Sequence, residues 1–140
     1  MSSEQIPSAL SAFVTHQQRA AGEILFVEGD EPEGIYIVES GTVDLFFASR
    51  HGAVKPLRSV AAGQILGLSA LVMAGTHDSS AITRTDCSVS FIARDDFLNA
   101  LDADPAVWFS VLSILSRHVN DAYDEMRWRS SRTLSHALAQ

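Results

Sequence analysis

Short runs of β-branched and aromatic residues, separated by turn-forming residues, constrain the fold of this chain more than any other feature. The runs are Ile24–Val27, Ile35–Val38, Val43–Phe47 and Ser88–Ile92, with Gly, Pro, Asp and Ser between them. Intervals of roughly 8–12 residues between such runs are typical of an antiparallel barrel or sandwich. The sequence therefore predicts a mainly β domain.

Helical patterns flank these predicted strands on both sides. Residues 4–20 carry apolar side chains at helical spacing and predict a short amphipathic N-terminal helix. Residues 95–101 begin with two acids and continue with helix formers, as a helix N-terminus does. Asp104 and Pro105 then predict the N-cap and the first residue of a second, longer helix.

The longer helix carries an apolar seam that predicts a homodimer interface. Its members recur at alternating spacings of four and three residues, as in a coiled coil. The seam residues are Trp108, Leu112, Leu115, Val119, Ala122 and Met126. The alternative is a helix that only covers its own barrel. Val111 and Ile114 form a second apolar face that is able to do this covering and leave the seam for a second copy.

Size and charge limit the classes of function. A chain of 140 residues is one domain by length, and its net charge of −7 does not suit nucleic-acid binding. A single cysteine, Cys87, excludes an intramolecular disulfide. We see neither a secretory signal nor an apolar run of membrane-spanning length, so we expect a cytoplasmic protein.

A pattern of glycines at turns, with strand residues between them, extends through Ala21–Val43, Ala62–Gly67 and Ala81–Val89. It resembles the cyclic-nucleotide-binding domain of the catabolite-activator/FNR regulators. The resemblance implies a double-stranded β-helix (a jelly-roll-like β-roll) with an N-terminal helix and a long C-terminal dimerisation helix. We therefore assign residues 1–126 to this β-roll domain and residues 127–140 to a basic tail or helix extension.

The tail is short for the DNA-binding winged helix that usually follows in this family. Residues 127–140 hold three arginines and no acid, which suits a helix C-terminus. The same cations, beside Trp128, are also of a kind that can touch nucleic acid, although we expect no such binding. We expect either a family member without that output domain or a fragment of a longer regulator.

The resemblance places a phosphate-binding loop at residues 67–80, GLSALVMAGTHDSS. It implies a short helix whose N–H groups face a phosphate, a glutamate for the ribose and an arginine for the phosphate. The glutamate position falls on Leu68 and the arginine position on Asp78, and no Lys or Arg lies between Val60 and Ile82. The candidate ligand-binding residues are Gly67, Leu68, Ser69, Ala70, Asp78, Ser79 and Ser80.

The two departures are large relative to an ordinary affinity. Loss of a hydrogen bond to a charged group costs about 1.5–3 kcal/mol. Like charges ~4 Å apart repel by about 4 kcal/mol at an effective dielectric constant of ~20. Micromolar binding is worth only about 8 kcal/mol. The sequence therefore predicts a degenerate loop that does not bind cyclic AMP in the usual way.

Three hypotheses for the pocket stay open. It binds an uncharged or cationic small molecule, it is empty, or it binds a cyclic nucleotide through backbone N–H groups with Ser79 and Ser80. Apolar loop side chains that fill the pocket would favour the hypothesis that no ligand binds there. An open cavity would favour a sensor. The apolar loop residues in question are Leu68, Leu71, Val72 and Met73.

Metal and catalytic motifs are not evident. The five histidines form no His-x-His or His-x-x-x-His pair, and no serine lies in Gly-x-Ser-x-Gly. A haem ligated by His77 or Cys87 is conceivable, but we expect a solvated loop histidine and a buried core cysteine. The sequence predicts a non-enzymatic, homodimeric sensor or regulatory module with no certain cofactor. The alternatives are a structural or protein-interaction dimer without a small ligand, and a cyclic-nucleotide-responsive transcriptional regulator or a fragment of one.

Overall fold

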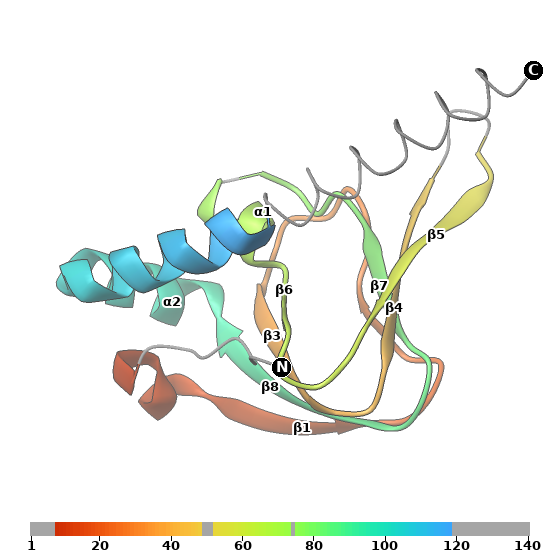
Figure 1. Cartoon of the computed structure of the whole chain (residues 1–140), viewed down its shortest axis with the longest axis horizontal. Coiled ribbons are helices and arrows are strands. Elements are labelled where there is room, and N and C mark those ends of the chain that lie inside the picture. The colour runs from red at the N-terminus through yellow and green to blue at the C-terminus, as the bar shows by residue number, and fades with distance from the viewer. Residues whose placement is uncertain (1–7, 49–51, 74, 119–140) are drawn as a thin grey trace, which may run out of the picture.

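Two antiparallel four-stranded sheets form the body of the protein in a computed structural model that describes residues 8–48, 52–73 and 75–118 (Figure 1). One sheet has the order β1-β8-β3-β6 and the other the order β2-β7-β4-β5. The first sheet contains β1 (Thr15–Arg19), β3 (Gly34–Ser40), β6 (Ile65–Leu66) and β8 (Cys87–Ala93). The second contains β2 (Ile24–Phe26), β4 (Val43–Ala48), β5 (Val54–Val60) and β7 (Ser80–Thr83).

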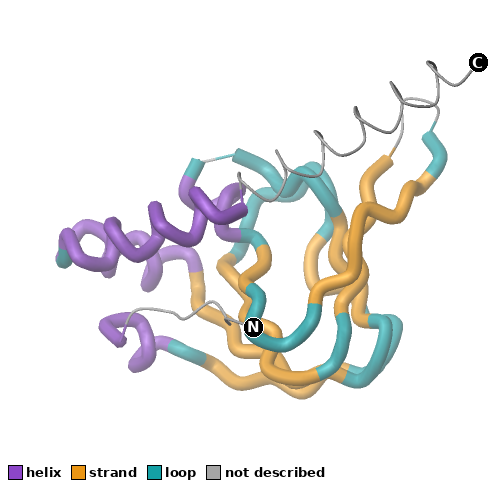
Figure 2. The backbone as a smooth tube through the Cα atoms, in the orientation of Figure 1, coloured by secondary structure: helices purple, strands orange, loops and turns teal. Residues whose placement is uncertain are grey.

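Helices cover the outer side of the first sheet (Figure 2). They are the 3-10 helix η1 (Ser8–Phe13), α1 (Leu68–Val72), α2 (Arg94–Ala103) and the helix Pro105–His118. The mainly β class and the flanking helices predicted from the sequence are confirmed. Within the described residues no single helix is long and apolar enough to cross a membrane. The last two reach that length and composition only as a pair bent by 117°.

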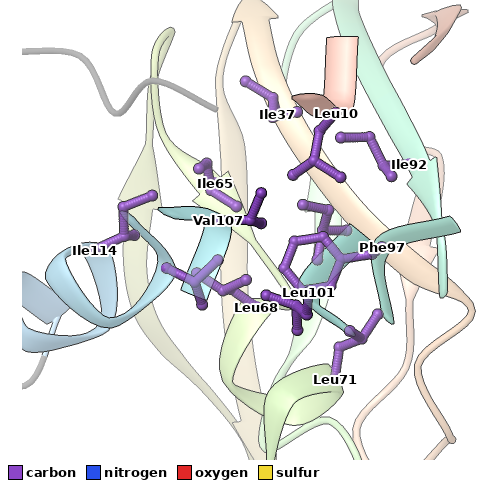
Figure 3. Packing of buried hydrophobic residues seen from close by; sticks show 12 residues of the cluster. Leu10, Ile37, Ile65, Leu68, Leu71, Ile92, Phe97, Leu101, Val107 and Ile114 are labelled. Carbon is purple, nitrogen blue, oxygen red and sulfur yellow. The ribbon is translucent and has the colours of Figure 1, made fainter. Parts of the chain in front are cut away.

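Strand β3 is buried on both faces, which explains its unbroken apolar sequence. Tyr36 and Val38 join the cluster between the two sheets, whereas Ile35 and Ile37 join the cluster beneath the helices. Side chains of a strand alternate between faces, so a strand covered on both sides needs apolar residues at every position. The helix-side cluster collects Leu68 and Leu71 of α1, Phe97 and Leu101 of α2, and Val107 and Ile114 of the last helix (Figure 3).

The predicted N-terminal helix over residues 4–20 is wrong in its second half. Within the described part of this segment only η1 is helical, and Thr15–Arg19 is a strand paired with β8 from Thr15↔Phe91 to Arg19↔Cys87. The reason is tertiary. The ladder with β8 supplies hydrogen bonds that outweigh the local helical spacing. Leu10 nevertheless packs in the helix-side cluster and is fully buried.

Strand β5 was not predicted, because its sequence is polar and contains a proline. Its residues are exposed up to Val60, and it lies at the edge of its sheet beside β4. An edge strand tolerates Pro56, since one row of its backbone groups has no neighbour to bond. The predicted runs at β2, β3, β4 and β8 are confirmed as strands.

The C-terminal helix begins as predicted. Asp104 Oδ1 accepts a hydrogen bond from the Ala106 N–H at 2.9 Å, which makes Asp104 the N-cap. Val107, Val111 and Ile114 are buried against the roll. Of the predicted seam, Trp108 is 39% exposed, Leu112 is 52% exposed and Leu115 packs partly against the helix-side cluster. The remaining seam positions (Val119, Ala122, Met126) and the tail 127–140 lie outside the described residues.

Gly34, at the start of β3, generates a test of this packing. An added Cβ would press on the Ile92 carbonyl oxygen and lie 2.6 Å from Cζ of Phe91. Because the Ile92 oxygen belongs to the backbone of β8, which is paired with β3, it cannot shift without disturbing the ladder, and we expect Gly34→Ala to lower the free energy of unfolding by about 1–3 kcal/mol. The matched control is Gly75→Ala, where nothing lies within 4 Å of the added Cβ. Urea denaturation of both variants measures this, and equal stability would contradict the packing described.

Candidate ligand-binding site

A cavity of about 270 Å³ lies at the end of the roll, between α1 with its following loop and the strands β4 and β5. From α1 and the loop it is lined by Gly67, Leu68, Ser69, Ala70, His77, Asp78 and Ser79. From the sheets and the last helix it is lined by Phe26, Leu45, Leu57, Arg58, Ile65, Leu66 and His118. The structure thus brings six of the seven predicted loop residues to one cavity.

Ser80 is the predicted residue that the cavity does not include. Its hydroxyl accepts a hydrogen bond from the Glu28 N–H at 2.9 Å. It instead borders a mostly apolar hollow of about 360 Å³ that is also lined by Val27 and Phe47. Ser80 therefore holds the segment that follows β2 and does not line the cavity.

A left-handed glycine sets the start of α1. Gly67 has φ 86° and its carbonyl accepts the first helical bond, from the Leu71 N–H at 3.3 Å. Leu68 and Leu71 are buried in the helix-side cluster and hold the short helix against β3. Ser69, between them on the opposite face, is exposed and borders the cavity. The loop backbone is therefore fixed from below, while its polar side remains accessible.

His77 is part of the cavity wall, not a solvated side chain as predicted. The residue is 5% exposed, and its ring stacks on Phe26 with centroids 3.9 Å apart. Its backbone is tied to the turn at Gly29–Asp30, donating to Asp30 O at 3.0 Å and accepting from the Gly29 N–H at 2.8 Å. Burial lowers the pKa of His77, although Asp78 and Asp30 oppose that change. Near pH 7 the ring is therefore a neutral aromatic surface.

Cys87, the other residue considered as a haem ligand, lies apart from the cavity that His77 borders. Cys87 is buried, as expected, and its thiol donates to the Thr85 carbonyl at 3.2 Å. It is absent from the cavity lining. Among the described residues no group of three or more His, Cys, Asp or Glu side chains could hold a metal ion. The geometry around these two residues is that of packing.

Comparison with known proteins decides the family. The profile of the cyclic nucleotide-binding domain matches residues 16–104. The chain belongs to this family. The resemblance found in the sequence is therefore confirmed.

Relatives of this cyclic nucleotide-binding domain are regulatory proteins. It is 28% identical to the cyclic AMP receptor protein of Thermus thermophilus over 98% of this chain and 67% of that protein. It is 32% identical to a cAMP-dependent protein kinase regulatory subunit of Aspergillus niger over 58% of this chain and 19% of that protein. The solved Catabolite Activator Protein of Thermus thermophilus superposes with a TM-score of 0.74 at 26% identity. That match covers 87% of this chain and 57% of that one.

Arg58, Phe26 and His118 border the cavity of this cyclic nucleotide-binding domain but were missed by the sequence reasoning. That reasoning searched for cations only between Val60 and Ile82, and Arg58 lies two residues before this range. Only the pairing of β5 with β4 shows that Arg58 comes back to the loop. His118, the last described residue of the helix that begins at Pro105, also borders the cavity, which sequence spacing does not reveal.

The buried imidazole generates a pH-dependent prediction. Because the pKa of His77 is lowered in the folded state, the unfolded chain binds its proton more readily. The resulting stability is fully present above the unfolded pKa of about 6.5 and is lost as pH falls through the folded-state pKa. We expect the unfolding free energy of the wild type to fall more between about pH 7.5 and pH 5 than that of His77→Phe, which keeps an aromatic ring against Phe26. Urea titrations at both pH values measure this, and equal losses would argue against it.

Proposed function

We propose that this domain is a non-enzymatic regulatory module that receives a small ligand in the cavity beside α1. The observation that carries the proposal is that the cavity is open and not filled by the apolar side chains of the loop. Leu68 and Leu71 are buried in the core below it, and Met73 is 76% exposed. In a domain that binds no ligand, we would expect these apolar side chains to fill the cavity.

The position of the last helix supports a regulatory role. His118, at the end of the described part of this helix, borders the same cavity as Ser69 and Asp78. Further down, Val107 and Ile114 share one buried cluster with Leu68 and Leu71 of α1. A ligand that binds one arrangement of α1 and this helix more tightly than another shifts the population between them. Ligand binding in the cavity would thereby change the position of the helix and affect any partner that contacts it.

The size of the cavity limits the ligand. About 270 Å³ lies just below the range of roughly 300–1,000 Å³ found for drug-sized ligands. The ligand is therefore a mononucleotide or a smaller metabolite. With Leu68 and Asp78 in the loop, a cyclic nucleotide would not be held in the way usual for the family. The relatives named for cyclic AMP nevertheless make cyclic AMP the first compound to test.

A ligand screen tests the proposal directly. We expect at least one compound among cyclic AMP, cyclic GMP, cyclic dinucleotides and small metabolites to raise the melting temperature. A ligand at 100 times its Kd adds about 2.7 kcal/mol, which is several degrees for a domain of this size. Differential scanning fluorimetry followed by calorimetry measures the effect. If no compound in the set raises the melting temperature, the result would favour the alternative, a dimeric interaction module without a small ligand.

We also propose that the module works as a homodimer through the last helix. Trp108 and Leu112 of the seam, together with neighbouring Phe109 at 74% exposed, leave large apolar surface on this helix in a single chain. A cluster of exposed apolar side chains of this kind is typical of a protein–protein interface. The described seam residues suit a second copy, and Val119, Ala122 and Met126 extend the same pattern in the sequence. The alternative of a transcriptional regulator would add a DNA-binding domain to this dimer.

Charge placed on the seam tests the dimer. We expect Leu112→Asp to convert a dimer into a folded monomer of 15.2 kDa, because the new carboxylate would be buried without a partner at the interface. Leu115 is left intact, since it packs partly against the core. Met73→Asp is the control, because Met73 is an apolar side chain that is 76% exposed and does not belong to the seam. Light scattering measures the mass, and an unchanged mass for Leu112→Asp would exclude this interface.

A further inference from the structure

Two charged side chains of opposite sign border the cavity without pairing. Among the described residues the ion pair observed is Arg84–Asp44, with 2.9 Å between Nε and Oδ2. Neither Arg58 nor Asp78 takes part in it or in a side-chain hydrogen bond within that part of the chain. Both are exposed at the cavity and come from different elements, Arg58 from β5 and Asp78 from the loop before β7.

The pairing of β4 with β5 directs Arg58 toward the cavity. Val43 pairs with Val60 and Leu45 with Arg58, whereas Asp44 and Ser59 between them bond each other on the other face. Val43, Leu45 and Val60 are buried in the cluster between the sheets, so Arg58 occupies an inward-facing position.

A shift of register strengthens this placement. After Leu45 the pairing jumps from Arg58 to Pro56, which leaves Leu57 as an extra residue in β5. A β-bulge changes the direction of side chains locally, and both Leu57 and Arg58 border the cavity. Leu57 thus adds an apolar side chain to the cavity lining.

The Arg58 guanidinium and the Asp78 carboxylate suit different groups of a ligand. A guanidinium presents five N–H donors in a planar fork that suits a carboxylate or phosphate. An ionised aspartate only accepts hydrogen bonds, so it suits a hydroxyl or amino group. The same cavity is also lined by the ring of His77, which stacks on Phe26. A purely anionic ligand would face Asp78 unfavourably, and a purely cationic one would face Arg58.

We propose that the cavity selects a small ligand that carries both an anionic group, bound by Arg58, and a hydroxyl or amino donor, bound by Asp78. This assignment rests on the proposed function of the cavity as a ligand site. It moves the cation that contacts the ligand from the loop to β5, which compensates for the loop's lack of Lys and Arg between Val60 and Ile82.

The test uses cyclic AMP and adenosine, which share a base and ribose and differ in the phosphate. Calorimetry on the full chain compares the wild type with Arg58→Gln, Arg58→Lys and Asp78→Asn. We expect Arg58→Gln to weaken cyclic AMP binding about tenfold or more and to leave adenosine unchanged, with Arg58→Lys intermediate. Asp78→Asn should weaken both compounds, because its partner is a donor that both carry.

A matched control separates a local contact from a change of net charge. Lys55→Gln removes one positive charge from the same strand at a position away from the cavity. It should leave both affinities within about twofold, and equal effects of Lys55→Gln and Arg58→Gln would overturn the proposal. Arg58 is exposed on an edge strand, so unchanged melting temperatures are expected and verify that the variants fold.

The outcomes separate this proposal from the proposed function. If cyclic AMP does not bind the wild type and the ligand screen finds only uncharged or purely cationic compounds, the assignment to Arg58 and Asp78 is overturned while the cavity remains a ligand site. If no compound in the screen binds, the proposed function fails and this inference fails with it.

Discussion

The double-sided burial of β3 is the constraint on which the rest of the structure depends. One face of the strand closes the interior of the roll through Val38, and the other holds the helices through Ile35 and Ile37. The helices α1 and Pro105–His118 are therefore packed on a common apolar surface rather than attached separately. Strand β3 thus contacts both α1, which borders the cavity, and the helix Pro105–His118 through one buried cluster.

The cavity illustrates how one backbone can carry different recognition chemistry. The left-handed Gly67 and the buried Leu68 and Leu71 fix the path of the loop without any charged group. The charges are placed independently, with Asp78 on the loop and Arg58 on β5. Because fold and charge placement are decided by different residues, membership of the family specifies the location of the cavity more strongly than the identity of its ligand.

Sequence reasoning succeeded where the signal is local and failed where pairing across the chain decides. The strand runs at β3, β4 and β8 and the N-cap at Asp104 follow from neighbouring residues. The sequence of β1 was predicted to be helical, because only pairing with β8 makes its extended conformation favourable. The loop predicted at residues 67–80 does border the cavity, whereas finding Arg58 required the register of β5, which no local pattern contains. The burial of His77 likewise depends on Phe26, fifty-one residues earlier in the chain.

The proposed link from cavity to helix requires that a ligand distinguish two arrangements of the helix, because equal affinity for both arrangements leaves their populations unchanged. Core contacts such as Val107 against the helix-side cluster do not touch the cavity, so they supply the stiffness of the link rather than its sensitivity. His118, at the end of the described part of the same helix, does border the cavity. Under the proposed function, the differential contact is therefore best placed near His118, where a change in helix position would alter the cavity wall.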